Sequence, residues 1–188
     1  MPATTTSTDR IEKLVNLDAP RSRVWRALTD VSQFNAWFGC ALTGKFTPGA
    51  EVSGKLTFRN YEHITMTIWI ETMEPERLFS FRWHPDATNP AIDYSAEPTT
   101  LVSFTLADAA DGTTLTIVES GFDAIPASRR ATAFSMNSAG WDGQVDPFEN
   151  FDAMNAGIDN FSEPTYVDHD REALAVTFLV CICCVGSH

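Results

Sequence analysis

The chain has 188 residues, 44% of them hydrophobic and 20% charged, which is the ordinary composition of a single globular domain. This composition excludes collagen, a coiled coil and a wholly disordered chain, and the net charge of −12 argues against binding to nucleic acid or anionic lipid. Residues 142–188 alone carry a net charge of −8, so the chain changes character towards its C-terminus.

The first forty residues predict one strand and two short helices. Residues 10–18 alternate loosely between polar and apolar types, as a strand does. Asp18 and Pro20 then mark a helix start, which favours an amphipathic helix over residues 20–29. A second short helix is expected over residues 31–37.

From residue 45 onwards the pattern becomes that of β-structure. Alternating segments separated by short turns predict strands over residues 52–59, 63–72, 78–84, 100–106 and 113–119. Residues 85–98 contain three prolines and are expected to form a loop. Because consecutive strands are joined by short turns, the sheet is predicted to be antiparallel.

A helix is predicted to start near Pro126. Its expected buried face carries residues spaced by three or four positions: Phe134, Ser138, Trp141, Val145 and Phe148. Pro147 is expected to kink or stop the helix. Beyond it, residues 150–170 are acidic without a sustained period, and Ala173 to Val185 form an apolar run too short to span a membrane.

Several motifs occur in an order that resembles a known family. They are Arg-Ile-Glu at 10–12, Val-Trp-Arg-Ala-Leu-Thr-Asp at 24–30, Trp-Phe-Gly at 37–39, Thr-Leu-Val-Ser-Phe-Thr-Leu at 100–106, Thr-Leu-Thr-Ile-Val-Glu-Ser-Gly-Phe at 114–122 and Gly140-Trp141. The chain resembles the activator of heat-shock-protein ATPase homologue family, C-terminal-domain type, within the SRPBCC superfamily of START domains and the birch-pollen allergen. The resemblance implies an α+β helix-grip fold, in which a curved antiparallel sheet wraps around a long C-terminal helix and leaves a cavity between them.

This resemblance suggests three segments. Residues 1–9 are expected to be a flexible leader, residues 10–150 the helix-grip domain, and residues 151–188 an atypical extension that is first acidic and then apolar. In the family the last helix stops near the end of the protein, whereas about 40 residues follow Pro147 here. The extension is either an added element or the product of an altered reading frame.

Aromatic side chains on the predicted strands and helices are the candidate ligand-binding residues, because aromatic rings offer large contact areas to planar or lipid-like molecules. They are Trp37, Trp69, Phe81, Trp83, Phe104, Phe134 and Trp141. The alternative for each is that it fills the core. Trp69 lies on the semi-polar face of its strand, so it belongs either to the surface or to a cavity wall.

Three polar residues are candidates for acid–base catalysis: Glu119, His63 and His84. Glu119 alternates with Leu115 and Ile117, which favours an inward orientation, and Arg59 or Arg82 could then be its partner. The alternatives are a hairpin-end carboxylate for Glu119 and ordinary exposed strand-end histidines for the other two.

Neither a metal nor a cofactor is implied by the sequence. Cys40 is isolated, and Cys181, Cys183, Cys184 and His188 do not have the spacing of zinc ligands. The N-terminal residues lack the apolar segment of a secretory signal, so a cytoplasmic protein is expected.

We therefore consider three hypotheses for the function. The first is a non-enzymatic protein that binds a small hydrophobic or aromatic molecule in its cavity. The second is a cyclase-type or hydrolase-type enzyme that uses cavity acid–base residues. The third, ranked last, is an interaction module that regulates a chaperone ATPase, as the family name suggests. The apolar run near the C-terminus would also favour a homodimer.

Overall fold

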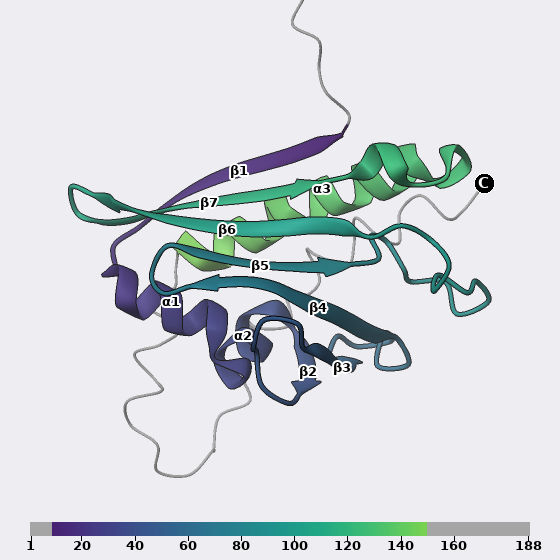
Figure 1. The fold of residues 1–188 in the computed structure, drawn as a ribbon, viewed down its shortest axis with the longest axis horizontal. Helices are drawn as coiled ribbons and strands as arrows, with labels where there is room; N and C mark the ends of the chain where they lie inside the picture. The colour runs from purple at the N-terminus through teal and green to yellow at the C-terminus, as the bar shows by residue number, and fades with distance from the viewer. Residues whose placement is uncertain (1–8, 150–188) are drawn as a thin grey trace, which may run out of the picture.

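The computed structural model describes residues 9–149, in which one antiparallel sheet carries helices on one side (Figure 1). The strands are β1 (Arg10–Leu17), β2 (Cys40–Thr43), β3 (Glu51–Leu56), β4 (Thr65–Glu74), β5 (Leu78–Trp83), β6 (Thr100–Ala109) and β7 (Gly112–Ser120). The helices are α1 (Arg21–Thr29), α2 (Val31–Phe38), the 3-10 turn η1 (Phe122–Ala124) and α3 (Ala127–Glu149).

The strand order across the sheet is β1-β7-β6-β5-β4-β3-β2, and each neighbouring pair is antiparallel. The first strand therefore closes one edge beside the last, while α1 and α2 carry the chain across to the opposite edge. The long α3 runs behind the sheet and packs mainly along β1 (Figure 1). This arrangement is the predicted helix-grip architecture: a curved antiparallel sheet with a C-terminal helix across it.

The two short helices meet at Asp30, which ends α1 and caps α2. Its carboxylate accepts hydrogen bonds from the backbone N–H groups of Ser32 and Gln33, and these contacts stabilise the first turn of α2. Asp18 does not cap α1, contrary to the sequence prediction: Pro20 occupies the N-cap position without a side-chain bond. Gly39 ends α2 in a left-handed conformation, and a Cβ there would lie 2.2 Å from the Phe58 ring.

The core lies between the sheet and the helices and is rich in aromatic rings. The fully buried large residues include Phe34, Phe38, Phe79, Phe81, Phe104 and Phe122. Their rings contact one another and neighbouring aromatic rings in stacked, tilted and edge-to-face arrangements; Phe34 meets Trp37 edge to face, with centroids 4.9 Å apart. Of the candidate ligand-binding residues, Phe81 and Phe104 are fully enclosed in this core.

One prediction about the long helix α3 needs correction. The buried face of α3 is rotated from the predicted one: its most buried side chains include Ala133, Met136, Asn137, Trp141 and Gln144. Phe134 is only half-buried, and its ring packs against Phe122. The described helix includes Pro147 and ends at Glu149, close to the place where a kink or stop was predicted. The predicted leader over residues 1–9, apart from Asp9, and the extension over 151–188 lie outside the described residues.

No helix among the described residues combines the length and the apolar character that a membrane crossing requires. Within residues 9–149, no group of three or more His, Cys, Asp or Glu side chains lies close enough to hold a metal ion.

Candidate functional site

A pocket of about 400 Å³ lies between the sheet and α3, where β4 extends beyond the end of β5. The pairing of β4 with β5 begins at Trp69 opposite Arg82, so residues 65–68 of β4 pair only with β3 in the described structure. The loop of residues 84–99 leaves β5 at this point and borders the gap. The pocket therefore opens through a split in the sheet, and its volume is that of a small-molecule site.

The buried part of the pocket is mostly apolar. It is lined by Phe38, Leu56, Ile64, Met66, Trp83, Met136, Asn137, Gly140 and Trp141. The mouth is more polar and is lined by Glu51, Thr65, Thr67, Trp69, His84, Asp86, Ala87, Thr88, Tyr94 and Ser95. An apolar interior with a polar rim is typical of a site for a small, largely hydrophobic molecule.

Behind the buried end of the pocket, Glu119 of β7 is completely enclosed. Its Oε1 accepts hydrogen bonds from Trp83 Nε1 at 2.7 Å, Thr100 Oγ1 at 2.6 Å and Asn137 Nδ2 at 2.8 Å. Its Oε2 accepts one from Trp141 Nε1 at 2.7 Å. We call Glu119 and these four donors the Glu119 cluster.

The topology explains why these five residues meet. Trp83 on β5 pairs with Thr100 on β6, and Glu119 lies near the same end of β7, so three adjacent strands contribute side chains to one inward-facing spot. Asn137 and Trp141 are four residues apart on α3 and therefore share the face that covers this spot. Burial raises the pKa of the Glu119 carboxyl, and the four donated hydrogen bonds oppose that rise.

The predicted cationic partner of Glu119 is wrong. Arg82 alternates with Phe81 and Trp83 and so points to the opposite face of β5, where its Nε bonds Glu71 at 3.0 Å. Arg59 is exposed in the turn after β3. The donors that hold Glu119 are all uncharged groups.

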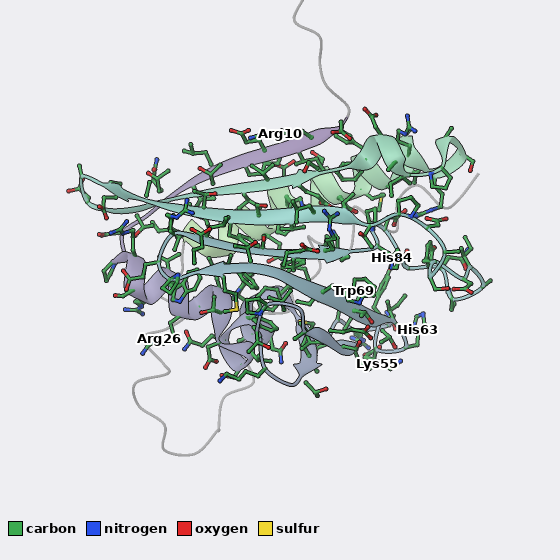
Figure 2. All side chains as sticks on the ribbon, in the orientation of Figure 1. Arg10, Arg26, Lys55, His63, Trp69 and His84 are labelled. Atoms are coloured by element: carbon green, nitrogen blue, oxygen red, sulfur yellow. The ribbon has the colours of Figure 1, made fainter. Side chains whose placement is uncertain are left out.

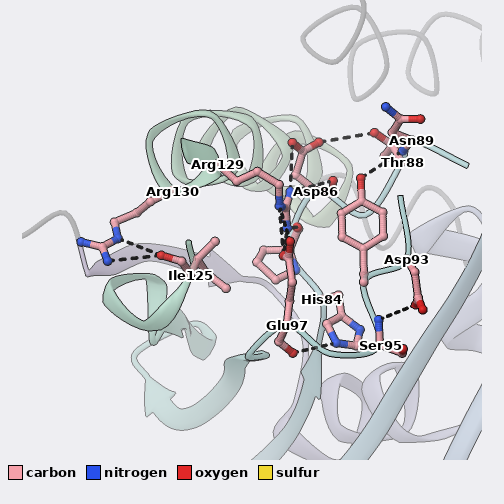
Figure 3. A network of polar contacts seen from close by, with 12 residues as sticks. His84, Asp86, Thr88, Asn89, Asp93, Ser95, Glu97, Ile125, Arg129 and Arg130 are labelled. Carbon is pink, nitrogen blue, oxygen red and sulfur yellow. Dashed lines mark hydrogen bonds and ion pairs between the residues drawn. The ribbon is translucent and has the colours of Figure 1, made fainter. Parts of the chain in front are cut away.

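A second polar group ties the 84–99 loop to the start of α3 (Figure 3). The Arg129 guanidinium donates to Glu97 Oε2 at 2.7 Å and to the Pro85 carbonyl at 3.1 Å, with the Asp86 carboxylate 3.9 Å away. The guanidinium also lies 4.7 Å from the centroid of the Tyr94 ring. We call these residues the Arg129 cluster. Burial raises the pKa of Asp86, against the opposing charge of Arg129.

The mouth brings together Glu51 of β3, Trp69 of β4 and His84, which directly follows β5; Figure 2 labels Trp69 and His84. The Trp69 indole donates to Glu51 at 2.9 Å and meets the His84 ring edge to face, with centroids 5.3 Å apart. His84 Nε2 lies 3.1 Å from the Glu97 carbonyl, which links the mouth to the Arg129 cluster.

The candidate residues from the sequence divide clearly. Trp69, Trp83 and Trp141 line the pocket, whereas Trp37, Phe81, Phe104 and Phe134 do not. Trp37 is buried in the core, where its indole donates to the Ala27 carbonyl at 3.1 Å. Alternation along a strand predicts which face of the sheet a residue occupies. It does not predict how close the residue lies to the pocket.

The three acid–base candidates do not converge inside the pocket. Of these, only His84 lines it; Glu119 lies behind its wall, and His63 is exposed in the turn before β4 beside Tyr61. Asn137 was missed by sequence reasoning, which followed the aromatic spacing on the helix. The inward orientation of Glu119 could have indicated a polar residue such as Asn137 on the helix, because a buried carboxylate needs hydrogen-bond donors from the element that covers it.

A curved antiparallel sheet with a long C-terminal helix across it and a pocket between them defines a helix-grip protein of the SRPBCC type. Residues 18–151 match the model of the family described as "Activator of Hsp90 ATPase homolog 1-like protein", and the chain belongs to this family. No curated protein matches the sequence.

Solved structures agree with this assignment. Protein MLL2253 from Mesorhizobium loti is 20% identical with a TM-score of 0.61, over 77% of this chain and 97% of that one. CalU16 from Micromonospora echinospora is 19% identical with a TM-score of 0.51, over 95% and 88%. DynU16, a protein in the dynemicin biosynthetic locus, is 27% identical with a TM-score of 0.59, over 78% of this chain but only 48% of DynU16.

Proposed function

We propose that this protein binds a small hydrophobic or aromatic molecule in the pocket between the sheet and α3. The observation that carries the proposal is the pocket of about 400 Å³, whose buried part is lined by two indoles, a phenylalanine and aliphatic side chains. Apolar surface removed from water on both partners would supply the binding free energy. The similarity to DynU16, a protein in the dynemicin biosynthetic locus, supports a ligand made by a biosynthetic pathway.

Native mass spectrometry of the purified full chain, followed by a denaturing run, tests the proposal first. Extra mass that disappears on denaturation would reveal a co-purified ligand, and the same spectrum would report whether the chain forms dimers. A neutral probe such as 1-aminoanthracene then measures binding directly, and we expect saturable fluorescence enhancement.

A pocket-filling variant makes this test specific to the site. Met136 lines the pocket, so Met136→Trp should abolish probe binding, while Ser135→Trp on the exposed neighbouring position should not. No saturable binding of the probe by the unmodified chain, with no co-purified ligand, would overturn the proposal. Equal binding by both variants would place the probe elsewhere on the molecule.

The second hypothesis, an enzyme of the cyclase or hydrolase type, is favoured by one observation, the raised pKa of the buried Glu119. However, Glu119 is not part of the pocket surface, and its four donors surround both oxygens. Regulation of a chaperone ATPase rests on the family's description alone, and a stimulated ATPase rate on adding this protein would support it. The similar Aha1 protein from Colwellia psychrerythraea is described as a dimer. The native mass spectrum therefore also tests whether this chain forms a dimer.

A further inference from the structure

The buried end of the pocket has few groups that could receive an anion. No Lys or Arg lies among the described residues that line the pocket, and its two charged lining residues, Glu51 and Asp86, are acidic. The indole N–H groups of Trp83 and Trp141 both point at Glu119 and are used by it. These two side chains therefore offer ring carbons, not hydrogen-bond donors, to a ligand at the buried end.

Asn137, unlike the two indoles, offers a polar atom to the pocket. Its Nδ2 donates to Glu119 Oε1 at 2.8 Å, and turning the amide over would place Oδ1 against a carboxylate oxygen. Glu119 therefore fixes the amide with its oxygen directed away from the carboxylate. Asn137 lines the pocket. Within the described structure its Oδ1 accepts no hydrogen bond, and it is accessible to solvent. The buried end of the pocket thus presents a hydrogen-bond acceptor.

We propose that Glu119 acts as a positioning residue for Asn137, and that together they make the pocket selective for uncharged, largely apolar ligands that carry a hydroxyl or N–H donor. Such a ligand would donate to Asn137 Oδ1 while its apolar body packs against Trp83, Trp141 and Met136. A carboxylate of the same shape would find an acceptor where it needs a donor, and would pass two acidic side chains at the mouth. This inference rests on the proposed function and deepens it.

Three naphthalenes of similar shape test the selectivity. They are 2-naphthol, which carries a donor, 2-methoxynaphthalene, which carries none, and 2-naphthoate, which is an anion. Dissociation constants are measured by displacement of 1-aminoanthracene from the full chain at neutral pH. We expect 2-naphthol to bind about fivefold more tightly than 2-methoxynaphthalene and at least about tenfold more tightly than 2-naphthoate.

Variants then assign the selectivity to the two residues. Asn137→Leu should bring the ratio between 2-naphthol and 2-methoxynaphthalene to about one without weakening 2-methoxynaphthalene. Glu119→Leu should also reduce this ratio, because it removes the acceptor that fixes the Asn137 amide. Glu119→Gln should keep the ratio, because three donors, Asn137 among them, hold an oxygen at the Oε1 position. Asn16→Leu, on the exposed face of β1, should leave the ratio unchanged. Loss of the preference through folding defects is recognised by circular dichroism of each variant.

The wild-type protein tests the selectivity, and the variants test its assignment: a preference for 2-naphthol that persists in Asn137→Leu would overturn the role given to Asn137. Equal affinities for the three compounds, or tightest binding of 2-naphthoate, would overturn the selectivity while leaving the proposed pocket function intact. Failure of all three compounds and of the 1-aminoanthracene probe would overturn the proposed function, and the selectivity with it.

Discussion

Two polar clusters flank the same pocket and stabilise their carboxylates by different means. The Glu119 cluster surrounds one fully buried carboxylate with four uncharged donors. The Arg129 cluster joins Glu97 and Asp86 to a guanidinium, and the side chains of all three residues remain 15–18% exposed. One cluster lies inside the fold between three strands and a helix, whereas the other ties a loop to the first turn of that helix (Figure 3).

The two clusters use different partners for their carboxylates because they differ in their exposure to water. Water can contact the Arg129 cluster, so its charges keep part of their hydration and their mutual attraction is moderate. Glu119 has no exposure to solvent, and a cation added beside it would itself have to be desolvated. Neutral donors avoid that second cost, and two of them are indoles whose rings also form the pocket wall. The Glu119 cluster therefore joins the core and the binding surface in one unit.

Replacing Glu119 should have the largest effect on stability. Glu119→Leu leaves four buried donors without an acceptor, and we expect the free energy of unfolding to fall by about 3–5 kcal/mol. Glu119→Gln keeps the shape but sets an amide nitrogen against at least one donor, for a loss of about 1–3 kcal/mol. Urea denaturation measures both, with the exposed Glu62→Gln as a control expected within about 0.5 kcal/mol. If Glu119→Leu were as stable as the wild type, the cluster would not be a structural centre.

Replacing Arg129 should have a smaller and more local effect. Arg129→Met leaves Glu97 and Asp86 without their cation, and we expect a loss of about 1–3 kcal/mol because these groups are only partly buried. The amides of residues 85–98 should exchange with solvent much faster, while those of β6 and β7 keep their protection. Hydrogen exchange followed by mass spectrometry measures this, with Arg59→Met as the exposed control. Uniformly faster exchange across the sheet would show that the two clusters are not independent.

Much of this fold could be predicted from local sequence patterns. Alternation identified β1 and β3 to β7 approximately and placed Glu119 inwards, because period-two burial is a property of the strand itself. The strand β2 was missed, since four residues are too few to show a period. The resemblance to the family then supplied the order in which these elements pack.

The pocket was less predictable, because it depends on where elements end. Phe81 and Trp83 share one face of β5, yet only Trp83 lines the pocket, since β5 stops there and residues 65–68 of β4 pair only with β3. On α3 the aromatic spacing correctly included Trp141, which lies over Glu119, but it left out Asn137, which also lies there. The buried face of α3 includes the polar Asn137. Its burial is explained by its hydrogen bond to Glu119 on β7, which the sequence of the helix does not show.

The pH dependence of stability should separate the two clusters further. Burial raises the pKa of Glu119 above its unfolded value, so the stability linked to this group is present at low pH and is lost as pH rises through the raised pKa. The difference in unfolding free energy between wild type and Glu119→Gln should therefore shrink as pH rises above the ordinary titration range of a glutamate. Urea denaturation at several pH values measures it. A difference that grows with pH would mean that the four hydrogen bonds lower the pKa of Glu119 by more than burial raises it.

Asp86 should show the same sign, since burial also raises its pKa, but Arg129 opposes the rise. In Arg129→Met that opposition is gone, so the loss of stability with rising pH should become steeper than in the wild type. The matched comparison is Arg59→Met, which should follow the wild-type profile. An unchanged slope in Arg129→Met would show that Asp86 gains its hydration when the loop loosens.

The smallest effect on stability is expected at the mouth of the pocket. Glu51 is exposed and accepts a hydrogen bond from Trp69, and a glutamine there still offers an oxygen to the indole. Glu51→Gln should change the unfolding free energy by less than about 0.5 kcal/mol. It should nevertheless tighten the binding of 2-naphthoate by about two- to threefold at low salt, because one of the two acidic groups at the mouth is removed.

Glu12→Gln on β1, the strand at the opposite edge of the sheet from β2, is the matched control, since it changes the net charge by the same amount. If both variants tightened 2-naphthoate binding equally, the total charge of −12 and not the mouth would be responsible. An effect confined to Glu51→Gln that fades at high salt would assign the anion rejection to the mouth. The remaining preference for 2-naphthol over 2-methoxynaphthalene would then belong to Asn137, whose orientation Glu119 fixes from behind the wall.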